Sequence, residues 1–184
     1  MMDATQAVTA PPAKPTLTNY LVVYTALFAC IALAVRMFQR EASATPSDAL
    51  VPPLFAMFGL TAVVWLLMAG LRNLMVALGR ASMRYYHSYA HDAPAEWIER
   101  PARTFNNLMQ VPLVFYAVCL IAMALDRVDT VQVNLAWMFV VLRIVHASIM
   151  LAWNFVPYRF AAYNAAMIAL VALALRVAER CWPQ

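Results

Sequence analysis

Five long apolar segments dominate the chain and limit what it can fold into. They cover residues 18–38, 50–79, 103–125, 131–153 and 160–178. Each approaches or exceeds the roughly 20 residues that an α-helix needs to cross the hydrocarbon core of a bilayer, and none shows the alternation of barrel strands. Because 65% of the residues are hydrophobic and only 12% are charged, the sequence predicts an all-α integral membrane protein.

The polar connection over residues 80–102 sets the expected orientation. It carries or adjoins more arginines than any other connection, namely Arg72, Arg80, Arg84, Arg100 and Arg103. Basic residues concentrate on the cytoplasmic side, so we expect a multi-pass protein with loop 80–102 in the cytoplasm. Residues 1–17 contain prolines and small polar residues and are expected to form a flexible tail, not a signal peptide.

The charge pattern also defines the expected partners. The sequence has no run of basic residues interleaved with aromatic residues, the pattern that is typical of proteins that bind along a nucleic acid. We therefore expect the lipid bilayer as a partner and no nucleic acid.

Polar side chains enter the third apolar segment on one helical face. Arg103, Asn107 and Gln110 are spaced four and three residues apart, which stacks them one turn apart on a helix, and Arg100 extends the stripe outward. Such side chains are costly toward lipid. The stripe should therefore face the bundle interior, a neighbouring subunit or a water-filled cleft.

The fourth apolar segment carries an arginine well inside it. Arg143 lies about 15 Å and His146 about 10 Å from the end near Trp153, at a 1.5 Å rise per residue. The third and fourth segments are antiparallel neighbours, so a polar cluster can form from Asn107, Gln110, Arg143 and His146. Two interpretations stay open. In the first, the cluster holds the helices together by interhelical hydrogen bonds. In the second, because no acidic residue lies near, the cluster binds an anionic ligand such as a carboxylate or phosphate.

Metal binding has little support in the sequence. His87 and His91 are four residues apart and are weak candidate ligands, but the neighbouring tyrosines indicate an interfacial aromatic belt. The three cysteines are single and distant from one another. We therefore expect no metal.

Two segments resemble a known family. The segment ERPARTFNNLMQVP (99–112) and the pattern AW-x-F-V-x-x-R-x-x-H (136–146) are similar to the MAPEG superfamily, the membrane-associated proteins in eicosanoid and glutathione metabolism, and especially to an uncharacterised bacterial branch. The resemblance covers about 50–178. It implies a four-helix membrane domain over 50–180, a homotrimer in the bacterial inner membrane, and glutathione bound between subunits. The helix at 18–38 is an addition to this pattern.

The resemblance also implies roles for individual residues. Arg159 would stabilise a glutathione thiolate as the catalytic residue. The cofactor-binding residues would be Arg100, Arg103, Asn107, Gln110, Arg143 and His146.

Two positions depart from the family pattern. Gln110 stands where an acid is usual, and Met150 replaces a tyrosine. These changes and the added helix favour a protein without an intact catalytic site, acting as a lipid-binding module or as an accessory subunit of a larger membrane complex. The alternative is a glutathione-dependent transferase or peroxidase acting on lipophilic electrophiles, so whether the protein is an enzyme is left open.

Overall fold

A computed structural model describes residues 16–39, 43–89 and 93–181 of the chain. The expected tail over 1–17 lies almost wholly outside these residues. The described elements are α1 (Leu17–Phe38), the 3₁₀ helix η1 (Ser47–Leu50), α2 (Val51–Ala77), α3 (Met83–Ser88), α4 (Glu96–Leu108), α5 (Val111–Ala124), α6 (Thr130–Ala152) and α7 (Val156–Cys181). Strands are absent from this part of the chain. Five stretches, counting α4 and α5 as one, are long and apolar enough to cross a membrane, which is consistent with the expected multi-pass protein.

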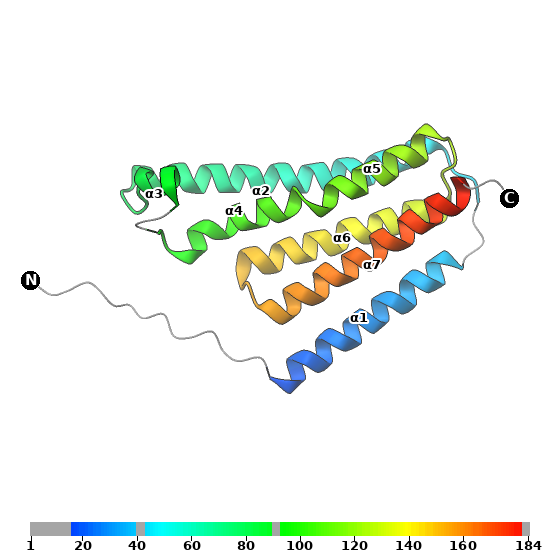
Figure 1. Cartoon of the computed structure of the whole chain (residues 1–184), viewed down its shortest axis with the longest axis horizontal. Coiled ribbons are helices and arrows are strands. Elements are labelled where there is room, and N and C mark those ends of the chain that lie inside the picture. The colour runs from blue at the N-terminus through cyan, green and yellow to red at the C-terminus, as the bar shows by residue number, and fades with distance from the viewer. Residues whose placement is uncertain (1–15, 40–42, 90–92, 182–184) are drawn as a thin grey trace, which may run out of the picture.

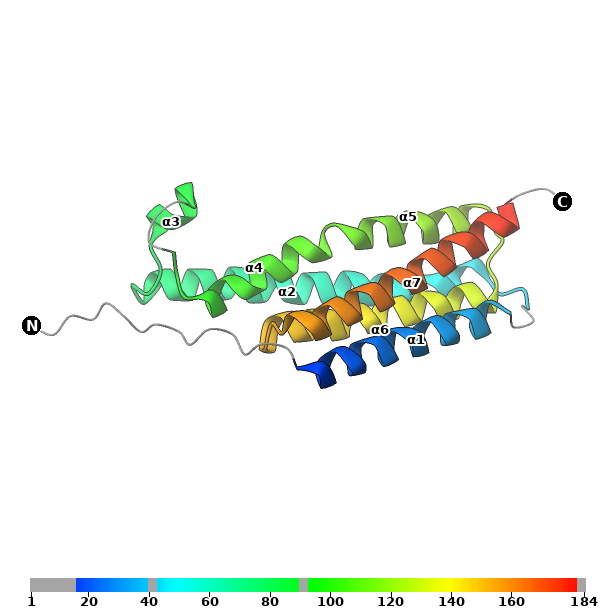
Figure 2. The same ribbon diagram turned by 60° about the horizontal axis from the view of Figure 1, so that its bottom comes forward.

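The helices form a layered bundle with α6 at its centre. Helix α6 packs most extensively on α7 and also contacts α1, α2 and α4. Helix α2 lies along α4, and α1 lies along the outer side of α7 (Figures 1 and 2). Successive spans run in opposite directions, so α1 and α7 run parallel. The additional helix therefore covers α7 and also contacts α6.

The core is built where apolar faces of α5, α6 and α7 meet. Phe115 of α5 stacks on Phe139 of α6 with ring centroids 4.6 Å apart, and both are fully buried. Helix α7 presents small side chains to this core, among them Ala166 and Ala169, which are at most 1% exposed. Small residues let helix backbones approach closely in membranes, where packing rather than the hydrophobic effect drives association.

The third apolar segment is not one continuous helix. Its helix begins earlier than the expected residue 103, at Glu96, and is interrupted at Met109 and Gln110 before α5 begins. Pro112 gives the physical reason. Proline lacks a backbone N–H, and its ring clashes with the carbonyl four residues back, which is that of Leu108. At the break, the last carbonyls of α4 accept only long bonds from three residues ahead, with Met109 donating to Asn106 at 3.3 Å and Gln110 donating to Asn107 at 3.5 Å.

Ion pairs fasten the two ends of the bundle. At the end near α3, Arg72 of α2 donates to Glu99 of α4 at 3.0 Å, and its guanidinium lies 4.8 Å from the ring centroid of Tyr86.

At the other end, Asp129 caps α6 by accepting from the backbone N–H of Gln132 at 2.9 Å. The same carboxylate pairs with Arg176 at 3.0 Å and with Arg180 at 3.2 Å, both from α7. Asp129 is 3% exposed, so one buried carboxylate joins the start of α6 to the end of α7.

We expect Asp129→Asn to lower the free energy of unfolding by about 2–3 kcal/mol. Asparagine still caps the helix, but the two arginines lose their shared buried anion. The matched control is Asp126→Asn, at an exposed position with a left-handed backbone, which should change stability by less than about 0.5 kcal/mol. Denaturant titration in detergent micelles measures both variants. Equal stability losses would contradict the assignment.

Candidate functional site

A groove of about 510 Å³ opens where α4, α6 and the start of α7 meet. Its lining combines cationic, amide and aromatic side chains, namely Arg103, Asn106, Asn107, Gln110, His146, Met150, Val156, Arg159, Phe160 and Tyr163. None of these ten described residues is acidic. The groove lies toward the same end of the bundle as α3 (Figure 1).

Arg143 lies behind this groove and is fully buried. Its Nη2 donates to the backbone oxygen of Asn107 at 3.0 Å and to the Asn107 side-chain oxygen at 2.7 Å. Asn107 belongs to the last turn of α4, where helix carbonyls carry partial negative charge. A cation normally needs an acid when buried, but here the open end of a broken helix supplies the acceptor. Arg143 therefore joins α6 to α4 through Asn107. Arg143 itself does not line the groove.

His146 lies one turn after Arg143 and does reach the groove. Its Nδ1 is 3.0 Å from the backbone oxygen of Arg159, so Nδ1 carries the hydrogen and Nε2 is the acceptor in the neutral ring. Nε2 is buried and has no hydrogen-bond partner within the described residues. The ring also lies 5.6 Å from that of Tyr163 between centroids. His146 thus lines the groove with its ring held in place and with one buried acceptor nitrogen unsatisfied.

Arg159 is oriented by the turn that precedes α7. Its Nη1 donates to the side-chain oxygen of Asn154 at 2.7 Å, and the Asn154 amide in turn donates to Glu96 at 3.1 Å. Asn154 has φ +49°, a left-handed conformation that asparagine tolerates better than most residues. This chain of hydrogen bonds links the starts of α4 and α7 and holds one of the two guanidinium groups of the groove.

The structure gathers most of the residues that the sequence singled out. Five of them line the groove: Arg103, Asn107, Gln110, His146 and Arg159. Two do not. Arg143 packs behind it, and Arg100 donates to the backbone oxygen of Ala152 at 2.6 Å outside it.

Sequence reasoning missed Asn106 and Tyr163. Helical spacing could have found both, since Asn106 lies three residues after Arg103 and Tyr163 lies four residues after Arg159.

The histidine pair stands apart from this site. His87 is exposed on α3, and His91 lies outside the described residues. Within residues 16–39, 43–89 and 93–181, no three His, Cys, Asp or Glu side chains come together in a group that could hold a metal ion.

We expect Arg143→Met to lower the free energy of unfolding by about 3 kcal/mol, because the two partly buried oxygens of Asn107 lose their charged donor. A double-mutant cycle with Asn107→Ala should give a coupling of about 1–2 kcal/mol. Arg103→Met, at an exposed position, is the control and should stay within about 0.5 kcal/mol of wild type. Strictly additive effects of the Arg143 and Asn107 substitutions would contradict the contact.

Comparisons with known proteins identify the family. No curated protein and no solved structure matches the chain significantly. The sequence profile of the MAPEG family matches residues 50–178, which span α2 to α7 and include every residue that lines the groove. The chain belongs to the MAPEG family.

Proposed function

We propose that the groove binds glutathione and that the protein is a glutathione-dependent transferase or peroxidase acting on lipophilic electrophiles. The observation that carries this proposal is the charge of the groove, which has two guanidinium groups and no acid among its described lining residues. Glutathione brings two carboxylates, one ammonium and one thiol. Guanidinium groups bind carboxylates strongly because their hydrogen bonds are charge-assisted.

The other lining groups suit the remainder of such a ligand. The side chains of Asn106, Asn107 and Gln110 offer amide donors and acceptors at one wall. The buried Nε2 of His146 lacks a donor, and a ligand N–H or S–H would satisfy it. The volume of about 510 Å³ lies within the range of about 300–1,000 Å³ that is usual for small-molecule sites.

Arg159 and Tyr163 supply the chemistry that a thiol ligand needs. Bound glutathione would supply a sulfur nucleophile. A guanidinium near a thiol stabilises the thiolate and so increases the reactive fraction at neutral pH. Arg159 is held for this role by Asn154, and Tyr163 adds a hydroxyl donor one turn further along α7. Val156 and Phe160 give the same wall an apolar surface against which a lipophilic electrophile can pack.

Orientation and assembly complete the proposal. The arginines near the α3 end favour a cytoplasmic location for that end, so the groove would open in the cytoplasmic half of the bacterial inner membrane. We propose a homotrimer, in which a neighbouring subunit would cover the open side of the groove.

A second candidate is a non-catalytic, lipid-binding or accessory subunit. Gln110 and Met150 favour it, because both line the groove and neither supplies the charge or hydroxyl expected at its position. The assembled set of Arg103, His146, Arg159 and Tyr163 favours the enzyme.

We expect glutathione to raise the Tm of the detergent-solubilised protein. At about ten times its Kd, the ligand should stabilise the fold by about 1.4 kcal/mol. Arg159→Ala should weaken binding by roughly tenfold or more, since a charge-assisted contact is lost. Arg80→Ala, at an exposed position outside the groove, should retain the wild-type shift.

The same preparation separates the two candidates. Conjugation of chlorodinitrobenzene that depends on Arg159 would support the enzyme. Absence of turnover would support the non-catalytic subunit, whether or not glutathione shifts the Tm, and no shift at millimolar glutathione would exclude the enzyme.

We expect Gln110→Glu to lower the Kd for glutathione by about fivefold. A carboxylate strengthens the hydrogen bond to the ligand ammonium by about 1 kcal/mol over a neutral amide. Calorimetric titration measures the change. N-acetylated glutathione lacks the ammonium and should show no such gain, and an equal gain with both ligands would refute an amine contact at residue 110.

A further inference from the structure

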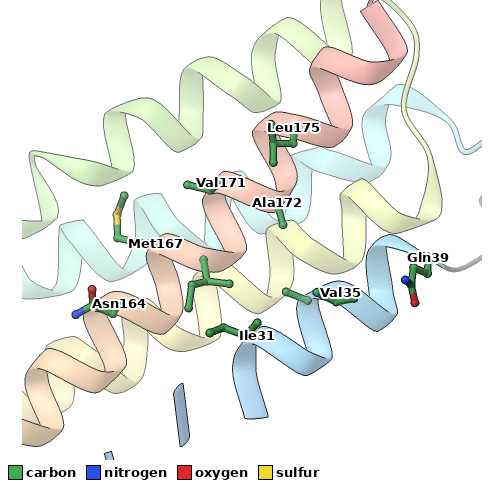
Figure 3. Close-up of a pocket in the computed structure, with 10 residues that line it drawn as sticks. Ile31, Val35, Gln39, Asn164, Met167, Val171, Ala172 and Leu175 are labelled. Atoms are coloured by element: carbon green, nitrogen blue, oxygen red, sulfur yellow. The ribbon is translucent and has the colours of Figure 1, made fainter. Parts of the chain in front are cut away.

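A second groove, with a volume of about 580 Å³, lies between the additional helix α1 and α7 (Figure 3). Its lining is apolar except at two positions, and consists of Ile31, Ala34, Val35, Gln39, Asn164, Met167, Ile168, Val171, Ala172 and Leu175. The two polar residues, Gln39 and Asn164, lie at opposite ends of the groove. None of these ten residues lines the groove between α4, α6 and the start of α7, which is called the polar groove below.

The groove exists because α1 touches α7 along a narrow stripe. Val23 and Ala34 are both 3% exposed, and Leu27 and Cys30 between them are partly buried. The spacing of four, three and four residues makes this stripe one face of the helix. At its start, the Tyr158 hydroxyl donates to the side chain of Asn19 at 3.0 Å. Beside the stripe, Ile31, Val35 and Gln39 follow one another at intervals of four and form one wall of the groove.

The shape of the groove distinguishes between a hydrocarbon chain and a helix. On α7 the groove runs from Asn164 to Leu175, about 16 Å at a 1.5 Å rise per residue. This length is about half of the roughly 30 Å thickness of the hydrocarbon core, which is the depth of one leaflet. A membrane-spanning helix of a second copy would run across the whole core. The groove therefore has the length that suits one extended acyl chain and not a spanning helix.

The positions of the two polar residues indicate which end of the groove would face a lipid head group. Apolar cavities do not hold water, so within a bilayer this lining requires hydrocarbon. Gln39 directly follows the last residue of α1, at the end of the span, where a lipid head group would lie. Asn164 lies about 12 Å along α7 from its start, and its Nδ2 donates to the Phe160 carbonyl at 2.8 Å. That internal bond lowers the cost of an amide at the deep end of the groove.

We propose that the groove between α1 and α7 binds one acyl chain of a bilayer phospholipid, which enters at Gln39 and extends toward Asn164. The lipid fills the space that α1 leaves beside its narrow contact stripe. It thereby joins the additional helix to the family domain. This site is independent of the glutathione proposal, because the two grooves have no lining residue in common.

Two valines of α1 provide a matched test. Val35 lines the groove and is 48% exposed, whereas Val22 is 49% exposed and lines none of the described grooves. Protein extracted in mild detergent is analysed by native mass spectrometry and by phospholipid extraction. Wild type and Val22→Trp should retain about one lipid per chain. Val35→Trp should retain roughly tenfold less, because the indole occupies the space and the apolar contact of the chain.

A second variant tests whether the loss of lipid is caused by misfolding. Ala172→Phe fills the same groove from α7 and should also release the lipid, while circular dichroism and the glutathione-induced Tm shift stay at wild-type values. Equal lipid content in Val35→Trp and Val22→Trp would overturn the proposal and indicate annular lipid only. Wild-type protein free of lipid would also overturn it. A change of oligomeric state in Val35→Trp without lipid in the wild type would assign the groove to a protein contact instead.

Discussion

The contact between Arg143 and Asn107 is the interaction on which the polar half of this bundle depends. An arginine inside a membrane helix cannot shed its charge, and here its acceptors are the backbone and side-chain oxygens of a single residue. The backbone oxygen can accept from Arg143 because α4 ends one residue later, ahead of Pro112. The broken helix and the buried cation therefore stabilise each other. Without the break, the backbone oxygen of Asn107 would accept from a helical N–H. Without Arg143, that oxygen would keep only the long bond from the N–H of Gln110, at 3.5 Å, which is costly in a membrane.

The same contact fixes the groove in front of it. Because α4 is held to α6 at Asn107, the side chains on the neighbouring turns project over His146 and the start of α7. The carbonyl of Arg159 fixes the ring of His146 from the other side. Three separate spans are thus tied together by backbone acceptors. The side chains that remain available to a ligand are then two guanidinium groups, amides and an imidazole nitrogen, a set that favours an anion.

Segment length and helical spacing allowed much of this arrangement to be predicted. The five apolar spans follow from length alone, and the shared face of Arg103, Asn107 and Gln110 follows from their spacing. Depth matching along the two helices also placed Arg143 in one cluster with Asn107, whose side-chain oxygen accepts from it at 2.7 Å. The second acceptor, the backbone oxygen of Asn107, could not be found in this way, because a carbonyl at a helix break leaves no residue type to look for. The position of α1 was equally inaccessible. Most of its surface is apolar, so the sequence does not indicate which face contacts the bundle.

Helix α7 separates the two grooves, and this bears on what the additional helix means. The polar groove uses Val156, Arg159, Phe160 and Tyr163, whereas the groove beside α1 begins at Asn164. At 100° per residue, the two sets occupy adjacent but different faces of α7. The start of α1 lies beside two residues of the polar groove, because Tyr20, Val23 and Tyr24 line a pocket together with Val156 and Phe160. No residue of α1 lines the polar groove itself, so the additional helix is no argument against glutathione chemistry. The argument against it reduces to Gln110 and Met150, two side chains whose contribution to ligand binding can be measured directly.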